Sequence, residues 1–245
     1  MAVPPARAVV AVVRYSADHM MISIIVPTLN EAHGLADTLA PLQPLRGALA
    51  EIIVVDGGSS DNTLGIAEPL ADRLLSSTRG RARQMNTGAA AAQGDTLLFL
   101  HADTRIDARA LAQLREVTTG HETSWGRFDV QPDHQRLVFR VITTLMNWRS
   151  CLTGIATGDQ GIFVQRQLFE QVGGYPDIAL MEDIALSRQL KSLDKPACIR
   201  TPVTIAMRYW EQHGILRSML RMWQLRLAYF FDTPPEKLHR RYYRD

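Results

Sequence analysis

Three short apolar runs, each followed at once by polar residues, are the feature that most constrains the fold of this chain. The runs lie at 22–27 (ISIIVP), 51–56 (EIIVVD) and 96–100 (TLLFL), and segments with helical spacing lie at 31–42, 62–75 and 81–92. Runs that are apolar throughout are typical of parallel strands buried on both faces. The alternation therefore predicts an α/β fold, with a Rossmann-like, mostly parallel sheet flanked by helices.

The rest of the chain has a weaker pattern and shows no linker. We expect helices at 107–117, 137–152, 181–193 and 215–231, a half-exposed strand at 125–130, and short strands at 160–164 and 203–207. One domain over 21–231 is the simplest organisation, with a nucleotide-binding half (21–103) and an acceptor half (104–231). A loose extension (1–20) would precede it and a basic tail (232–245) would follow it.

Composition excludes several classes of protein. A formal net charge of +2 in 245 residues is too even for a dedicated nucleic-acid binder. No run approaches the roughly 20 apolar residues of a membrane-spanning helix. Cys151 and Cys198 lack the spacing of a thiolate metal site, so we expect two small core residues in a reducing cytoplasm.

Polar residues follow each of the three predicted strands. They are PTLNE at 27–31, DGGSSD at 56–61 and HAD at 101–103. Ligands of open α/β sheets bind beyond the carboxyl ends of the parallel strands, so these segments should meet at one edge. Any one of these polar residues could have a purely structural role instead; Asp61, for example, could cap the next helix.

The turn at 56–59 suits a nucleoside. The Asp56 carboxylate can accept a hydrogen bond from a base or ribose, and the glycines let a ligand approach the backbone. The segment contains neither a Walker loop nor a dinucleotide fingerprint. Arginines 79, 81 and 83 then stand at the start of a helix, where a diphosphate would be favourable, although a solvated basic face is the alternative.

The HAD segment predicts a cation site. Asp103 could hold Mg²⁺ or Mn²⁺ against the diphosphate leaving group, and Mn²⁺ would also accept the imidazole of His101. Farther along, Glu182 and Asp183 begin a helix, and only one of them is expected to face inward. Such a carboxylate could take the proton of an attacking hydroxyl, or both could merely favour the helix start.

With these motifs assembled, the chain resembles family 2 glycosyltransferases of the GT-A fold. The segments SIIVPTLNE, EIIVVDGGSSDNT, GDTLLFLHADT and GYPDIALMEDIALSRQL are similar to that family's motifs, in the same order, across 21–207. The chain looks closest to the small soluble radical-SAM/selenodomain-associated, or arsenosugar-biosynthesis type, subgroup. The resemblance implies an inverting enzyme that uses a nucleoside-diphosphate sugar.

The resemblance also implies residue roles. Asp183 matches the catalytic base, with Glu182 beside it, and Asp103 matches the metal-binding acid, with His101 in place of the family's first acid. The family's usual arginine falls on Met85, so Arg81 or Arg83 must supply that charge. The predicted nucleotide-sugar contacts are Pro27, Asn30, Glu31, Asp56, Gly57, Gly58, Ser59, Arg81, Arg83, Asn86 and Ala102. The predicted acceptor or donor-sugar contacts are Gly158, Asp159, Gln160 and Trp210.

Two other functions remain open from the sequence. A sugar nucleotidyltransferase would share the sheet and the metal acid, but it usually needs a glycine-rich basic loop where residues 28–31 stand. A non-catalytic protein could instead bind a partner or a membrane, because 215–231 reads as a basic amphipathic helix suited to anionic lipid. Alternatively, the apolar side of this helix packs on the domain and has only a structural role. A lipid-linked acceptor at the inner face of the membrane would be compatible with both activities.

Overall fold

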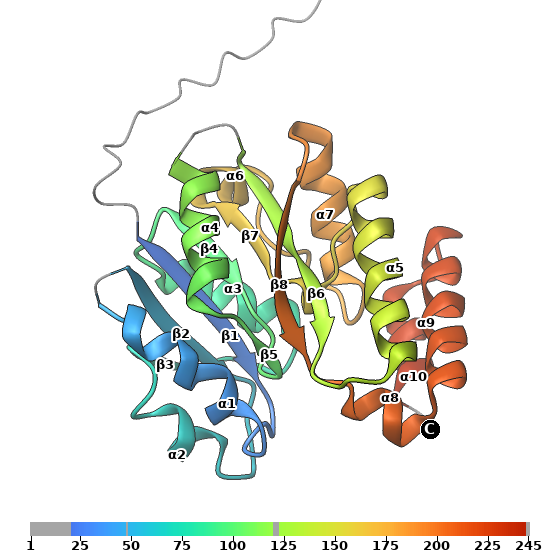
Figure 1. The fold of residues 1–245 in the computed structure, drawn as a ribbon, viewed down its shortest axis with the longest axis horizontal. Coiled ribbons are helices and arrows are strands. Elements are labelled where there is room, and N and C mark those ends of the chain that lie inside the picture. Colours follow the sequence, from blue (N-terminus) through green and yellow to red (C-terminus); the bar gives the residue numbers. More distant parts are fainter. Residues whose placement is uncertain (1–20, 48, 120–122, 244–245) are drawn as a thin grey trace, which may run out of the picture.

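The computed structural model describes residues 21–47, 49–119 and 123–243 as one mixed sheet with helices on both faces (Figure 1). The predicted extension at 1–20 lies outside the described residues. The eight strands of the sheet run in the order β3-β2-β1-β4-β7-β6-β8-β5. They are β1 (Ile22–Thr28), β2 (Ala50–Asp56), β3 (Arg73–Ser76), β4 (Thr96–Phe99), β5 (Thr104–Arg105), β6 (Trp125–Pro132), β7 (Ile162–Gln165) and β8 (Ala197–Ile205).

The helices follow the predicted pattern more closely in the second half of the chain than in the first. The α-helices are α1 (Leu35–Leu39), α2 (Thr63–Ala67), α3 (Arg81–Ala91), α4 (Ala108–Thr119), α5 (Leu137–Thr153), α6 (Arg166–Gln171), α7 (Glu182–Leu193), α8 (Arg208–His213), α9 (Ile215–Phe230) and α10 (Pro235–Tyr242). The described residues also form the 3₁₀ helices η2 (Ala40–Leu45) and η3 (Gly158–Gln160).

The three predicted apolar runs form the centre of the sheet. β1 pairs in parallel with β2 and with β4, and β2 with β3. Because side chains alternate along a strand, Ile24 packs into the core on one face of the sheet and Ile25 into the core on the other. Both residues are fully buried, which explains why the runs show no polar alternation.

Two predictions in this half are wrong in extent. The helix expected at 62–75 ends at Ala67, and the chain continues into the edge strand β3. Pro69 explains the break, because proline cannot donate the hydrogen bond that a continuing helix needs. The helix expected at 31–42 is likewise short, since Pro41 and Pro44 fall in the 3₁₀ helix η2.

The second half adds strands of both directions. β7 is antiparallel to β4 and β6, and β8 runs parallel to β6. β6 was expected to be half-exposed, but its first four residues are buried because both faces are covered: Trp125 packs into one core and Phe128 into the other. The strand expected at 203–207 begins earlier, at Ala197, and ends at Ile205.

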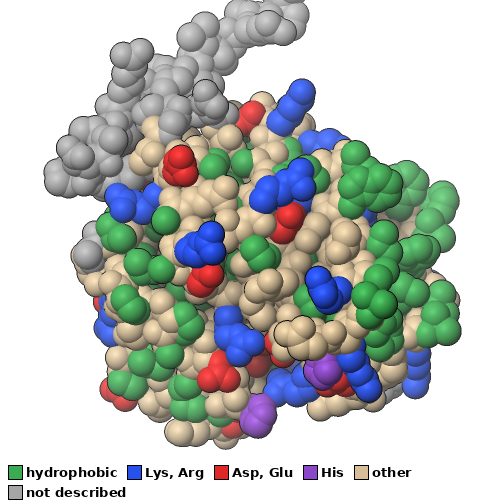
Figure 2. Space-filling model, viewed as in Figure 1, with side chains coloured by type: hydrophobic (Ala, Val, Ile, Leu, Met, Phe, Trp, Pro, Cys, Tyr) green, Lys and Arg blue, Asp and Glu red, His purple; other side chains and the backbone are tan. Residues whose placement is uncertain are grey.

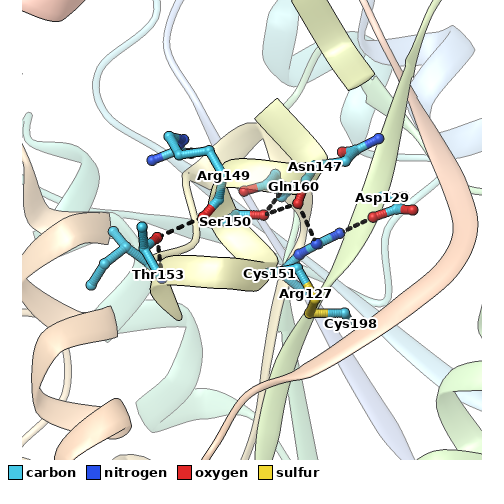
Figure 3. The surroundings of a disulfide bond; sticks show 10 residues. Arg127, Asp129, Asn147, Arg149, Ser150, Cys151, Thr153, Gln160 and Cys198 are labelled. Carbon is cyan, nitrogen blue, oxygen red and sulfur yellow. Dashed lines mark hydrogen bonds and ion pairs between the residues drawn. A yellow bond between two sulfur atoms is a disulfide. The ribbon is translucent and has the colours of Figure 1, made fainter. Parts of the chain in front are cut away.

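The two cysteines are paired, which corrects the prediction of two separate core residues. Cys151 near the end of α5 and Cys198 in β8 form a disulfide, with Cα atoms 6.1 Å apart (Figure 3). β8 brings Cys198 beside α5 from 47 residues away. Neither cysteine is buried. Disulfides persist mainly in oxidising compartments, so the pairing removes the cysteine-based argument for a reducing cytoplasm.

Removal of this disulfide should weaken the fold. We expect Cys151→Ser to lower the free energy of unfolding by about 2–4 kcal/mol, because the bridge closes a long loop of the unfolded chain. Urea denaturation of the oxidised protein measures this change. The same comparison in reductant is the control, and an equal loss there would show that the serine acts through packing rather than through the bridge.

The C-terminal helices pack beside the β6–β8 part of the sheet, next to α5 (Figure 1). Leu225 of α9 and Leu238 of α10 form a small core with Met181 and Ile184, which flank the first two residues of α7. Leu238 is fully buried. Residues 235–242, which the sequence placed in a tail, are therefore part of the packed structure at the start of α7.

Candidate active site

A cavity of about 270 Å³ lies where the carboxyl ends of β1 and β4 face the start of α7. Several segments that are distant in the sequence contribute polar groups to it. From the predicted set it is lined by Pro27, Glu31, Arg81, His101, Ala102, Asp103, Gly158, Asp159, Glu182, Asp183 and Trp210. Two of the three segments that the sequence predicted to meet at one edge, 27–31 and 101–103, thus contribute to one cavity, whereas 56–61 does not line it.

Both acids at the start of α7 line this cavity, whereas only one of them was expected to face inward. Met181 precedes them with a φ of 72°, in the left-handed region that is uncommon for a residue with a side chain. This residue turns the chain into α7. Glu182 is 5% exposed, and its Oε1 lies 3.4 Å from Nη1 of Arg81. Burial raises the pKa of Glu182, Arg81 opposes that change and Asp183 adds to it.

Asp183 is held by two backbone hydrogen bonds. Gly158 N–H donates to its Oδ2 at 3.0 Å, and Ile184 N–H donates to its Oδ1 at 2.7 Å. Each carboxylate oxygen has a second lone pair that can accept another proton or hydrogen bond. The carboxylate is therefore oriented at the cavity and retains the capacity to act as a base.

His101 joins the β4 end of the cavity to η3. Its Nδ1 lies 3.1 Å from Oδ1 of Asp159. A Cβ added to Gly158 would collide with the imidazole ring, so only glycine fits at that position. His101 is thus engaged with the wall of the cavity rather than extended toward its centre.

Asp103 and Glu31 form the group best suited to a cation. Asp103 is exposed and has no hydrogen bond or ion pair with any residue in the described ranges, and its charge, after burial, raises the pKa of Glu31. The charges of Arg208, Arg81 and His101 oppose that rise in the pKa of Glu31. The two carboxylates offer hard oxygen ligands of the kind that Mg²⁺ and Mn²⁺ accept. Among the described residues, no three His, Cys, Asp or Glu side chains form a metal site by themselves. Ligand oxygens or water would have to complete the shell, as is usual for Mg²⁺.

A second cavity of about 860 Å³ adjoins the first and shares Pro27, Glu31, Arg81 and Glu182 with it. Asn30 and Arg83 also line it, and Arg83 pairs with Asp177 at 2.8 Å. Its outer wall comes from α10 and the residue after it, through Glu236, His239 and Tyr243. The His239 and Tyr243 rings contact each other, with centroids 4.5 Å apart.

Six predicted contact residues line neither cavity, and they hold the surrounding backbone instead. Asp56 is 3% exposed, and it accepts hydrogen bonds from Gly58 N at 2.8 Å and Ser59 N at 2.9 Å. Asn86 bonds both backbone groups of Tyr175, and Gln160 donates to Ser150 Oγ at 2.9 Å. The six are Asp56, Gly57, Gly58, Ser59, Asn86 and Gln160.

The residues that α9 and α10 bring to the site were not predicted from the sequence. Met222, Leu225 and Arg226 of α9 and Tyr242 of α10 line the smaller cavity. Their only signal was a basic, aromatic-rich C-terminus, for which the sequence left both membrane contact and packing on the domain open. A prediction that α10 folds back over the start of α7 would have been needed to find them.

The sequence profile described as "Glycosyl transferase family 2" matches residues 23–172. A "PGL/p-HBAD biosynthesis glycosyltransferase" from Mycobacterium bovis (strain BCG / Pasteur 1173P2) is 33% identical over 168 residues, which cover 63% of this chain and 63% of the relative. A "Poly-beta-1,6-N-acetyl-D-glucosamine synthase" from Staphylococcus aureus (strain COL) is 25% identical over 186 residues, 69% of this chain and 45% of the synthase. The match thus spans less than two thirds of the length of these curated relatives.

A solved structure with the same fold is that of S. aureus TarS 1-349 in complex with UDP-GlcNAc. It superimposes with a TM-score of 0.62 at 20% identity, over 76% of this chain and 58% of TarS. The sheet and its helices thus adopt the GT-A fold predicted from the sequence motifs.

Proposed function

The chain belongs to glycosyl transferase family 2, and on that premise we propose that it moves a sugar from a nucleoside-diphosphate-sugar donor onto an acceptor hydroxyl. The observation that carries this proposal is the shared cavity. Asp103 after β4 and Asp183 at the start of α7 are 80 residues apart (183 − 103), yet they line the same 270 Å³ space with Arg81. Transfer from a diphosphate leaving group needs a cationic environment and a base close together.

The donor's nucleoside would occupy the larger cavity. Residues 27–31 form one wall of this cavity and α10 forms another, and its volume of about 860 Å³ is within the range of nucleotide-sized sites. Arg81 lies where the two cavities join, so its guanidinium can bind the diphosphate. UDP-GlcNAc is bound in the TarS structure, which supports a nucleotide-sugar donor for this chain. A contact between Asp56 and the base stays a prediction, because the Asp56 carboxylate is occupied by its own turn.

Mg²⁺ or Mn²⁺ would be held by Asp103, with Glu31 nearby. When bound, such an ion would neutralise charge that develops on the departing diphosphate. The mannosyltransferase PcManGT from Pyrobaculum calidifontis, crystallised with GDP-Man and Mn²⁺, has the same fold and supports this choice of ion. His101 remains a candidate second ligand, although its Nδ1 faces Asp159.

Asp183 is proposed as the general base. It would take the proton of the acceptor hydroxyl as that oxygen forms a bond to the anomeric carbon. The electron pair of the breaking carbon–oxygen bond would leave with the nucleoside diphosphate, so the configuration at that carbon would invert. The hydrogen bonds from Gly158 and Ile184 orient the carboxylate for this step. Buried Glu182 would contact the sugar while Arg81 partly balances its charge.

The proposals for the acceptor, the cellular location and the subgroup come from the sequence alone. A lipid-linked acceptor, contact of the C-terminal helix with a membrane, a position at the cytoplasmic face and the radical-SAM/selenodomain-associated subgroup all rest on the sequence argument. The single domain predicted at 21–231 is proposed to include α10 as well, because Leu238 is buried against it.

Calorimetric titration tests the proposed function. We expect one of UDP, GDP and TDP to bind with an affinity that depends on Mn²⁺ or Mg²⁺, and the matching nucleotide sugar to release that diphosphate in the presence of acceptor. Release of pyrophosphate from a nucleoside triphosphate and a sugar phosphate would instead establish a nucleotidyltransferase. If none of the three nucleotides bound, the result would contradict both proposed activities, glycosyltransferase and nucleotidyltransferase.

Replacement of Tyr243 should weaken donor binding. Its ring lines the larger cavity beside His239, and a stacked base loses about 1 kcal/mol or more when its aromatic partner is removed. We expect Tyr243→Ala to raise the Kd of the nucleoside diphosphate about fivefold or more. Phe231→Ala is the matched control, because Phe231 is exposed and lines neither cavity. If the two variants bound the nucleoside diphosphate with equal affinity, the wall that α10 and Tyr243 form would not be part of the donor site.

A further inference from the structure

Two neighbouring helices expose a continuous set of large apolar side chains. Figure 2 shows hydrophobic side chains gathered over the part of the molecule where Figure 1 places α5 and α9. We call this set the α5–α9 surface. It consists of Leu137, Val138, Val141, Leu145, Trp148 and Leu152 on α5 and of Leu216, Leu220, Trp223, Leu227, Phe230 and Phe231 on or directly after α9.

The exposure of these side chains is large and its spacing is regular. Trp148 is 66% exposed and Trp223 is 67% exposed, and the side chains recur every three or four residues along each helix. Such spacing normally marks the buried stripe of an amphipathic helix. Only four other large apolar side chains in the described ranges are comparably exposed, and they are scattered at Leu64, Leu74, Leu193 and Tyr243. An apolar surface of this kind indicates an interaction site.

The charges on the two helices are all positive. The cationic residues are Arg140, Arg149, Arg217, Arg221 and Arg226, and neither helix contains Asp, Glu or Lys. Burial, together with the nearby charge of Arg226, lowers the pKa of Arg149 to about 10, which is consistent with the two helices lying side by side. Exposed Arg240 and Arg241 of α10 add charge beside α9. The acids nearest in sequence, Glu211 and Asp232, lie beyond the ends of α9.

This combination of side chains fits a lipid bilayer better than a second copy of the chain. A symmetric dimer places the same patch on both sides, so arginines would face arginines with no acid from either helix to pair with them. Anionic headgroups would instead interact with exposed Arg140 on α5 and with Arg240 and Arg241 beside α9, while Trp, Phe and Leu side chains enter the boundary between headgroups and acyl chains. No helix in the described part of the chain is long and apolar enough to cross a membrane.

We propose that the α5–α9 surface docks on an anionic lipid membrane. The opposite side of α9 carries Met222, Leu225 and Arg226 to the 270 Å³ cavity, so one helix lies between lipid and the proposed active site. A helix with its side chains is about 10 Å across, which a membrane-borne acceptor head could span. This proposal extends the membrane contact suggested by the C-terminal sequence to α5, and it does not require that the transfer chemistry be correct.

Vesicle flotation tests the proposal with the full chain. We expect binding to vesicles of phosphatidylcholine and phosphatidylglycerol about tenfold or more tighter than to phosphatidylcholine alone, decreasing with salt. The double variant Trp148→Glu and Trp223→Glu should lose this binding about tenfold or more. Leu193→Glu, at a position on α7 that is 51% exposed, should not. Arg140→Glu should weaken binding to the anionic vesicles several-fold.

Two measurements distinguish failure of this proposal from failure of the proposed function. Nucleoside-diphosphate binding in solution should be equal in the wild type and in the double variant, which also shows that the variant is folded. Sedimentation of the lipid-free protein reports a dimer directly. The membrane proposal would be overturned if the wild type ignored anionic vesicles, if the double variant bound as well as the wild type, or if the tryptophans proved necessary only for dimerisation.

Discussion

Asp183→Asn is expected to slow sugar transfer by about 100-fold or more while the Kd of the nucleoside diphosphate stays unchanged. The amide keeps the size of the carboxylate but cannot take a proton, and general bases contribute about 100- to 10,000-fold. The nucleotide should be unaffected because Asp183 lines the smaller cavity and not the larger one. Initial rates at saturating donor, together with calorimetric titration, measure the two effects separately.

A structural role of Asp183 must be distinguished from a catalytic one, because both of its oxygens accept backbone hydrogen bonds. An amide nitrogen would face one of these N–H donors, so the variant is expected to lose some stability. The Tm of Asp183→Asn, and partial recovery of rate in Asp183→Glu, provide the comparison. If transfer and nucleotide affinity fell by the same factor, the assignment as base would be wrong.

Asp103→Ala is expected to abolish the metal dependence of donor binding and, with it, turnover. Asp103 has no hydrogen bond or ion pair within the described ranges, so its removal should leave the fold intact. The ion that Asp103 would hold neutralises charge on the diphosphate, so loss of the ion should also weaken nucleotide binding. We therefore expect the affinity of the variant for the nucleoside diphosphate in Mn²⁺ to fall about 100-fold or more, to the value that the wild type shows in chelator.

The control for this variant is Asp37→Ala. Asp37 is an exposed acid in α1, a short helix that follows β1, and it lines neither cavity. Its removal changes net charge by the same amount as the removal of Asp103. If the two variants lost donor affinity equally, the effect would be one of overall charge, and Asp103 would have no role as a ligand. Retention of metal-dependent binding by Asp103→Ala would lead to the same conclusion.

Much of the fold could be predicted from local sequence pattern. The strands at β1, β2 and β4 are apolar over their whole length, because buried parallel strands have no solvent-facing side. Short elements were harder to predict. β3 has only four residues and follows a segment with helical spacing, so the break at Pro69 was needed to separate it from α2.

The residues of the candidate site likewise fall into those that could be predicted from the sequence and those that could not. Residues that directly follow strands, such as Glu31 and Asp103, could be placed because the sheet itself sets their position. The tertiary partners of other residues could not be predicted. Arg81 meets Glu182 across 101 positions, and the pairing of Cys151 with Cys198 depends on where β8 enters the sheet. The contribution of α10 was not predicted either, because it depends on a chain reversal after α9.

The proposed transfer reaction requires Asp103, Arg81 and Asp183 to surround one bound donor, and a crystal structure with the nucleoside diphosphate and Mn²⁺ tests this arrangement most directly. We expect the nucleoside between residues 27–31 and α10, the diphosphate beside Arg81, and the ion on Asp103, with Asp183 facing the position that the sugar would occupy. A nucleotide bound elsewhere on the chain, or an ion that does not contact Asp103, would contradict this arrangement.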